Sequence, residues 1–324
     1  MSVLLNALTE LQEREGWLPE AGLREIAERC RVPLHRLESL STFYTHFRRA
    51  EPRGRELEVC RDVACQLAGR GDAIDGLRTL LGELGVELRD VSCLGRCDSA
   101  PAGSIGDYTV NLRSEAELRA ALDGSAARER PIRSWAADPY SSAAERYGAL
   151  RRWVADDPAR LLAELAASGL RGMGGAGFPT ARKWQLVASQ AASPKYVVCN
   201  ADESEPGSFK DREVLHDLPH LVIEGMALAG FATGASSGIL FIRHEYAAER
   251  RRFEAELAAA RAAGALGEQL FGSDFGFDVE IVVSPGGYIL ARRRRCSSAW
   301  KTAAASRVTS RRCLASRACA VSRR

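Results

Sequence analysis

Four cysteines stand in two closely spaced pairs that could bind a metal. Cys60 and Cys65 follow one predicted strand, and Cys93 and Cys97 follow the next one. Thiolates are soft ligands that suit iron–sulfur clusters or zinc, and a set of four fits a 2Fe-2S cluster with two sulfurs on each iron. Zinc ribbons usually have two residues between paired cysteines, so spacers of four and three residues favour the cluster. Zinc, or buried cysteines without metal, remain the alternatives.

A glycine-rich segment, GLRGMGGAGFPTARKW at residues 169–184, could bind a phosphate. Backbone N–H groups without side chains around them can point at one anion, as in loops that precede helices and bind nucleotides. Lys183 could add a positive charge. A glycine pattern is weak evidence by itself, and a tight structural turn is the alternative reading.

A third segment, NADESEPGSFKDRE, follows a predicted strand that ends at Cys199. It concentrates Asp202, Glu203, Glu205 and Asp211 in one loop, and such a loop could bind ribose or ribityl hydroxyl groups. The alternative is a solvated charged loop, which is the usual meaning of such a run.

Hydrophobic periodicity indicates the elements that must position these residues. Amphipathic helices are predicted over residues 3–15 and 20–31, followed by a strand, a helix over 72–85, a second strand over 86–92 and a loop that contains Pro101. Past residue 141, helices and strands alternate, which indicates an α/β domain. The elements predicted there are helix 157–167, strand 195–199, a loop at 200–211, helix 219–233, strand 238–243, helix 247–263 and strand 277–283.

Composition and charge set the broad class. The chain has 324 residues, 46% of them hydrophobic, and nine cysteines. It shows no secretory leader and no apolar run long enough to span a membrane, so we expect a cytoplasmic protein without membrane insertion. Eleven of the 45 basic residues lie in residues 290–324, which contain no acid, and the body before them is acidic. Such a basic tail could bind nucleic acid or a membrane surface, but we do not favour this interpretation.

Most of residues 3–122 resemble a known protein family. The runs SLSTFYTHF, EVCRDVAC and VSCLGRCDSAPAGSIGDY are similar to the small iron–sulfur subunit of the NADH dehydrogenase module of respiratory complex I. The resemblance implies a thioredoxin-like fold with a helical N-terminal cap and one-electron transfer. It gives the ligand role for a 2Fe-2S cluster to Cys60, Cys65, Cys93 and Cys97.

Residues 141–289 resemble the flavoprotein subunit of the same module, which binds FMN and NADH in a Rossmann-like domain. The resemblance rests on GLRGMGGAGFPTARKW, YVVCNADESEPGSFKDRE, LPHLVIEGMALAG and FIRHEYAAE, in that order. It implies NADH contacts at Phe178 and Glu205, with Glu205 as the catalytic candidate. Met173 stands where the family has arginine, which weakens a phosphate or flavin contact. The implied FMN contacts are Gly172, Gly174, Lys183, Asn200, Asp202, Glu203, Ser204 and Tyr288.

The tail departs from that family. After SPGGYI the family continues with an acidic pair and later a 4Fe-4S domain, whereas residues 290–324 lack acids and hydrophobic periodicity. Back-translated and shifted by one base, the tail can be read as the expected continuation. We therefore expect a frameshift at Ile289 or Leu290, a disordered tail, weak FMN binding, little or no diaphorase activity and no 4Fe-4S cluster in this chain.

The predicted organisation is an α/β protein with a thioredoxin-like 2Fe-2S ferredoxin domain at 1–123, a linker at 124–140, and an incomplete FMN/NADH-binding domain at 141–289. We expect electron transfer from NADH through FMN to the cluster. Expected partners are other subunits of an NADH dehydrogenase, hydrogenase or formate dehydrogenase complex, and no nucleic acid. A non-enzymatic 2Fe-2S carrier or assembly subunit is the alternative.

Overall fold

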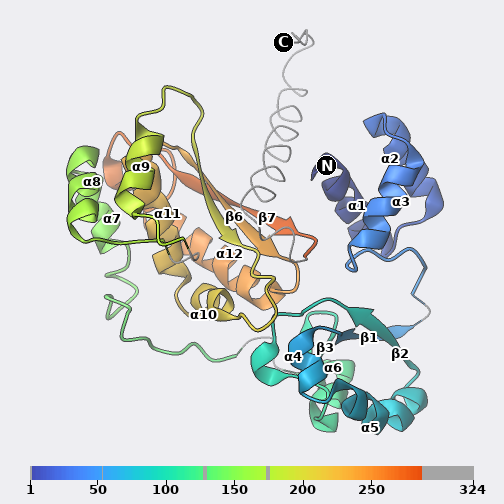
Figure 1. Cartoon of the computed structure of the whole chain (residues 1–324). Coiled ribbons are helices and arrows are strands. Elements are labelled where there is room, and N and C mark those ends of the chain that lie inside the picture. The colour runs from blue at the N-terminus through green and yellow to red at the C-terminus, as the bar shows by residue number, and fades with distance from the viewer. Residues whose placement is uncertain (1, 53, 127–129, 173–175, 287–324) are drawn as a thin grey trace. The chain divides into compact units, whose positions relative to one another are not determined.

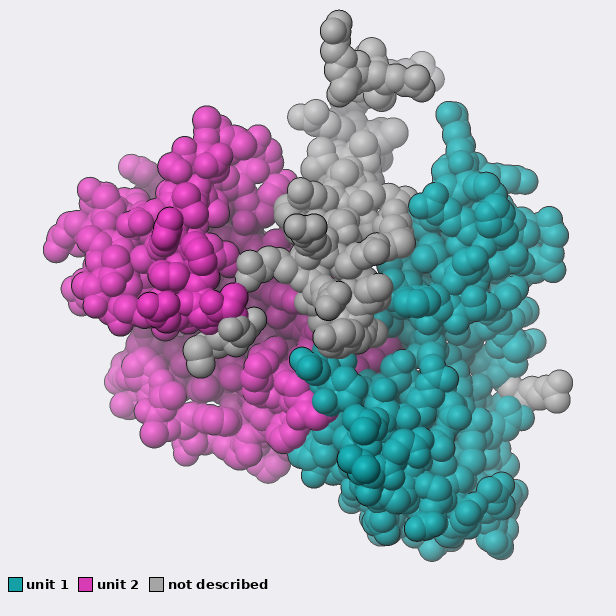
Figure 2. All heavy atoms as spheres, viewed as in Figure 1, with its two compact units in different colours: residues 1–124, 204–206, 284–324 teal, residues 125–203, 207–283 magenta. Residues whose placement is uncertain are grey.

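The computed structural model describes residues 2–52, 54–126, 130–172 and 176–286. The chain divides into two compact units, coloured in Figure 2. Unit 1 comprises residues 1–124, 204–206 and 284–324, and unit 2 comprises residues 125–203 and 207–283.

Unit 1 begins with three helices and continues with a four-stranded sheet (Figure 1). The strand order is β2-β1-β3-β4, with β1 and β2 parallel and the β1–β3 and β3–β4 pairs antiparallel. The elements are α1 (Ser2–Glu15), α2 (Glu20–Cys30), α3 (Leu34–Phe43), β1 (Arg55–Cys60), α4 (Val63–Leu67), α5 (Arg70–Glu83), β2 (Val86–Val91), η1 (Cys97–Ser99), β3 (Ala102–Ile105), β4 (Tyr108–Asn111) and α6 (Glu115–Asp123).

The parallel pair β1 and β2 explains why the two cysteine loops meet. Parallel strands need a crossover, which α5 supplies between them. In their register Cys60 lies opposite Val91, so both strands end at the same edge of the sheet. Leu57 and Val59 on β1 are fully buried, which fixes which face of this strand is covered.

Unit 2 is an α/β unit around a three-stranded sheet of order β5-β6-β7, with β5 and β6 parallel (Figure 1). Its elements are α7 (Gly148–Trp153), α8 (Pro158–Ala167), α9 (Thr180–Ala188), β5 (Tyr196–Ala201), α10 (Lys210–Asp217), α11 (Pro219–Thr233), β6 (Ser237–Arg243), α12 (Ala247–Ala262), η2 (Leu270–Gly272) and β7 (Asp278–Ser284).

The core of unit 2 lies between α11 and the sheet. Strand β6 is buried along almost its whole length, as expected for the central strand of a covered sheet. Helix α11 is apolar nearly all round, and Ile223, Met226 and Ala227 belong to the same core cluster as Phe277. The close approach of Phe277 requires glycine at Gly230, where an added Cβ would lie 2.5 Å from the Phe277 ring.

Some elements differ from the sequence-based expectation. The segment after Cys97 contains the β3–β4 hairpin and α6, where the sequence predicts a loop. The predicted loop at 200–211 is shorter, because α10 begins at Lys210. The predicted aberrant tail, 290–324, lies outside the described residues. Among the residues the structure does describe, no helix has both the length and the apolar character needed to cross a bilayer.

Candidate metal centre and nucleotide-binding loops

The four predicted ligand cysteines lie together at one edge of the sheet of unit 1. Cys60 is the last residue of β1, Cys65 lies in α4, Cys93 follows β2 and Cys97 begins η1. Three of them are at most 4% exposed, and Cys97 is half-buried. Cys60, Cys65 and Cys93 share one buried cluster, against which Cys97 packs. The two cysteine pairs are far apart in sequence, but their four thiols therefore lie around one common site.

Distances and donors support a common site for these thiols. The Sγ atoms of Cys93 and Cys97 are 3.5 Å apart. The backbone N–H of Gly95 donates to Cys93 Sγ at 3.4 Å, and that of Ala102 donates to Cys65 Sγ at 3.4 Å. No disulfide joins any of the six described cysteines. N–H donors to cluster sulfurs are one of the features by which proteins tune a reduction potential.

The thiols also influence each other's protonation. The hydrogen bond between Cys60 and Cys65 raises the pKa of Cys60 to about 11 and lowers the pKa of Cys65 to about 7. In Cys60 burial acts in the same direction, whereas in Cys65 it opposes the shift. Thiolates are the form that ligates metals, so Cys65 is the thiol of this pair closest to that form at neutral pH.

One neighbour of the thiols is not among the ligands that the sequence predicts. A carboxylate oxygen of Asp62 and the Sγ atoms of Cys60 and Cys93 all lie within 4.8 Å of one another. The signal is present in the run Cys-Arg-Asp after β1, but carboxylates are hard ligands that suit other metals. The donor set as a whole, four clustered thiols, fits a 2Fe-2S cluster.

The glycine-rich loop of unit 2 is closed at its base. The N–H of Gly172 donates to the Phe178 carbonyl at 2.9 Å, and the N–H of Thr180 donates to the Leu170 carbonyl at 2.9 Å. Gly172, Phe178 and Lys183 are all exposed, with Lys183 in the first turn of α9. The backbone N–H of Gly172 therefore has a partner already, whereas the Lys183 side chain lies at the surface beside the loop. Gly174 and Met173 lie outside the described residues.

The acidic loop follows the carboxyl end of β5, which is parallel to β6. Ligands of open α/β sheets bind at such strand ends. Asn200 is exposed and its side-chain oxygen accepts from the N–H of Asp202 at 3.3 Å. Asp202 and Ser204 are buried, whereas Glu205 is exposed. Tyr288, the last predicted flavin contact, lies outside the described residues.

Glu203 has a set of partners that the sequence does not indicate. One carboxylate oxygen accepts from Ser208 at 2.7 Å and from Lys210 at 3.2 Å. The other accepts from the backbone N–H of Asp211 at 3.0 Å and of Arg212 at 3.2 Å. Burial alone would raise the pKa of Glu203, but these hydrogen bonds hold it below its usual value. Glu203 thus caps the first turn of α10, in addition to its predicted role.

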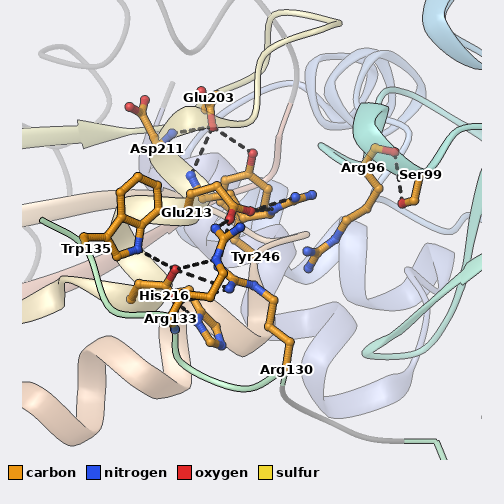
Figure 3. A network of polar contacts seen from close by, with 12 residues as sticks. Arg96, Ser99, Arg130, Arg133, Trp135, Glu203, Asp211, Glu213, His216 and Tyr246 are labelled. Atoms are coloured by element: carbon orange, nitrogen blue, oxygen red, sulfur yellow. Dashed lines mark hydrogen bonds and ion pairs between the residues drawn. The ribbon is translucent and has the colours of Figure 1, made fainter.

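Two further buried groups fix Glu203. The Tyr246 hydroxyl donates to its carboxylate at 3.1 Å, and the Arg243 guanidinium donates to its backbone carbonyl. Arg243 also forms an ion pair with Glu245 at 2.8 Å. Burial and the neighbouring Glu203 raise the pKa of Tyr246, so this tyrosine stays neutral and remains a donor. Figure 3 shows the Tyr246 hydroxyl and the backbone nitrogen of Asp211 directed at the Glu203 carboxylate.

Two family models match the chain. The model of the thioredoxin-like [2Fe-2S] ferredoxin matches residues 1–126, and the model of the Nuo51 FMN-binding domain matches residues 165–303. The chain joins a thioredoxin-like [2Fe-2S] ferredoxin domain to a Nuo51 FMN-binding domain. The cysteine cluster lies in the ferredoxin domain, and the glycine-rich and acidic loops lie in the FMN-binding domain.

Known relatives cover one or both domains. The NAD-reducing hydrogenase HoxS subunit alpha of Cupriavidus necator is 30% identical over 320 residues, which include 88% of this chain and 53% of that subunit. A subunit of an NADH-quinone oxidoreductase of Rhizobium meliloti is 45% identical over 144 residues, 44% of this chain and 34% of that subunit. The chain therefore spans about half, or less, of the relatives it matches.

A solved structure supports the same fold. A chain in the crystal structure of the NAD+-reducing [NiFe]-hydrogenase in the H2-reduced state matches with a TM-score of 0.69 and 26% identity. The match covers 88% of this chain and 52% of that one. The predicted fold class, a thioredoxin-like 2Fe-2S domain followed by an FMN-binding α/β domain, is confirmed.

Proposed function

We propose that the chain transfers electrons from NADH through FMN to a 2Fe-2S cluster, as a subunit of a larger oxidoreductase. The observation that carries this proposal is the union of the two domains in one chain, together with a hydrogenase relative that aligns across both. FMN, when bound, would supply the change from two-electron hydride chemistry with NADH to one-electron transfer. A 2Fe-2S cluster accepts one electron at a time.

The residues of this chain supply binding and orientation. Cys60, Cys65, Cys93 and Cys97 would ligate the cluster, and the Gly95 and Ala102 N–H groups would remain donors to two of those sulfurs. This assignment is supported by the proximity of the four thiols and by their soft-ligand chemistry.

On the flavin side, we assign FMN contacts to Gly172, Lys183, Asn200, Asp202, Glu203 and Ser204, and NADH contacts to Phe178 and Glu205. The position of the acidic loop at the carboxyl end of β5 and the exposed side chains of Lys183, Phe178 and Glu205 support it. Glu205 is the proposed catalytic residue. Glu203 serves mainly to hold the loop, because its carboxylate already accepts from five donors.

The partners we propose are the other subunits of an NADH dehydrogenase, an NAD-linked hydrogenase or a formate dehydrogenase. The first two are supported by the relatives in Rhizobium meliloti and Cupriavidus necator. We also propose a cytoplasmic location, since clustered cysteines that bind a metal are more typical of reducing compartments than a disulfide framework is.

An anaerobic NADH titration of the purified chain, reconstituted with iron, sulfide and FMN, tests the proposal. With FMN in excess, to offset the weak binding expected of this chain, we expect NADH to bleach the flavin absorption slowly and to produce the electron paramagnetic resonance signal of a reduced 2Fe-2S cluster. Omitting FMN should abolish the signal. A chain that carries the cluster but binds no FMN would instead act as a non-enzymatic carrier, and a colourless protein containing zinc would refute the cluster.

A further inference from the structure

Residues 130–147, here called the belt, lie between the two family matches and contact three helices of unit 2. Their contacts are polar and involve carboxylates or a histidine on those helices. Beyond the contacts to α10, they are Asp138 with His220 (3.1 Å), the Tyr140 hydroxyl with Glu224 (2.8 Å), Arg146 with Glu256 (2.9 Å) and the Tyr147 hydroxyl with Glu256 (2.7 Å). Much of the predicted linker is thus bound along the FMN-binding unit.

The strongest belt contact is at Asp217, the last residue of α10. Its side chain is fully buried and accepts from Arg130 at 3.1 Å, Arg133 Nε at 3.2 Å and Trp135 Nε1 at 2.8 Å. The neighbouring His216 ring is 2.8 Å from it. Figure 3 shows Arg130, Arg133 and Trp135 converging at this end of the helix. A buried carboxylate with this many donors is held in one position, and we call Asp217 with these donors the anchor.

Helix α10 connects the anchor at Asp217 to the acidic loop. Its last residue is Asp217, and its first turn is capped by the carboxylate of Glu203. The helix has eight residues, and isolated helices of that length are marginal in water. It therefore depends on tertiary contacts, which are the packing of Leu215 in the core and the polar contacts at its two ends. Loosening the Asp217 end should loosen the first turn, and with it Glu203.

We propose that Asp217 is a positioning residue for the acidic loop, residues 200–209, acting through α10 on Glu203. The belt is then part of the flavin site although no residue of it need touch the flavin. The consequence for FMN rests on the proposed function, because it requires that this loop contact the flavin. The effect of Asp217 on the position of the loop does not depend on the proposed function.

Two variants and two readouts test the proposal. Asp217→Asn removes the charge at the anchor, and Arg133→Gln, at a side chain that is 55% exposed, weakens the anchor without leaving a buried carboxylate unpaired. Hydrogen exchange by mass spectrometry reports on the backbone of residues 200–209, and quenching of FMN fluorescence gives its dissociation constant. Arg250→Gln is the matched control, since Arg250 pairs with Glu254 at the surface of α12.

We expect exchange in residues 200–209 to accelerate by about tenfold in Asp217→Asn and less in Arg133→Gln, and FMN binding to weaken in the same order by up to roughly tenfold. Arg250→Gln should change neither. A loss of stability alone would lower the unfolding temperature without changing the affinity of the folded protein for FMN. If Asp217→Asn does not fold, Arg133→Gln carries the test.

Unchanged exchange at residues 200–209 in a folded variant would overturn the proposal. Faster exchange with unchanged FMN affinity would overturn its flavin consequence. If the unmodified chain binds no FMN, the proposed function fails, whereas the exchange data still decide whether Asp217 positions the loop.

Discussion

At the scale of single residues, the cysteine cluster yields the most direct prediction. Replacing Cys65 and Cys93 together by serine should abolish the cluster, because hydroxyl oxygens are poor substitutes for soft thiolate ligands. The unmodified protein, purified anaerobically or reconstituted, should contain about two irons and two sulfides per chain. Visible absorption with iron and acid-labile sulfide assays measures the difference.

Two controls make the cysteine result specific. Cys30→Ser should keep the full iron content, since Cys30 is half-buried in α2 and lies outside the thiol cluster. Asp62→Asn should also keep it, although the Asp62 carboxylate lies near two thiols. Loss of iron in Asp62→Asn would show that a carboxylate completes the site and would argue against an all-cysteine ligand set.

Asp217 gives a pH-dependent prediction. Burial alone would raise the pKa of its carboxyl, but the hydrogen bonds from His216 and Trp135 and the charge of Arg130 hold this pKa well below its usual range. A depressed pKa in the folded state stabilises the protein above the unfolded value of about 3.9, and this contribution is lost as the pH falls through the folded value. The difference in unfolding free energy between the unmodified protein and Asp217→Asn should thus be equal at pH 7 and pH 5.

Urea unfolding at three pH values measures this contribution. Below pH 4 the same difference should shrink progressively, because the unfolded carboxyl then binds protons whereas the folded carboxyl, with its lowered pKa, stays ionised until the pH is lower still. A difference that stays constant from pH 7 to pH 3 would show that Asp217 is not held ionised by its partners.

The sequence predicts residue types at the sites better than residue partners. The two cysteine pairs can be placed together because both follow strands, and adjacent parallel strands end at one sheet edge. The inward orientation of the Glu203 carboxylate could not be foreseen, because its donors include Tyr246, 43 positions away. Which carboxylate of an acidic loop turns inward depends on tertiary contacts that local sequence does not encode.

At the scale of elements, two glycines of α11 form a matched pair. Gly230→Ala should lower the free energy of unfolding by about 2 kcal/mol, because the added methyl would collide with the Phe277 ring and with the Ala235 carbonyl oxygen, 2.9 Å away. Gly225→Ala, with no atom within 4 Å of its added Cβ, should raise this free energy by up to about 1 kcal/mol. Urea unfolding curves of the two variants measure both changes in the free energy of unfolding. Equal effects would mean that α11 does not pack closely at Gly230.

Element prediction succeeds where periodicity is strong and fails where elements are short. The helices near 219–233 and 247–263 and the strand near 238–243 are predictable because their apolar residues repeat with a clear period. Strands β3 and β4 have four residues each, too few to show a pattern. The belt shows no periodicity, which is typical of a linker, yet polar contacts to residues more than 80 positions away hold it in place.

At the scale of the whole molecule, the two units have separate interiors. The cluster around the thiols and the core around α11 share no residue. We therefore expect the double variant of Cys65 and Cys93 to bind FMN within about threefold of the unmodified affinity, and Gly230→Ala to keep its iron content. FMN titration and iron assay measure both. A larger change in either direction would show that the two domains depend on each other for folding.

The belt also bears on how this molecule can be shortened. A fragment that starts at residue 165, the first residue of the FMN-binding family match, would lose Tyr140, Arg146 and Tyr147. Two carboxylates, on Glu224 and Glu256, would then lie in the helical layer without those donors. Such a fragment would also lose Leu150, Trp153 and Leu161 from the core cluster and expose the apolar surface that they cover, so we expect it to aggregate, whereas one beginning at residue 130 keeps these residues and every one of the pairs. The segment that the FMN-binding family model matches is thus shorter than the segment that we expect to fold as a stable, soluble fragment.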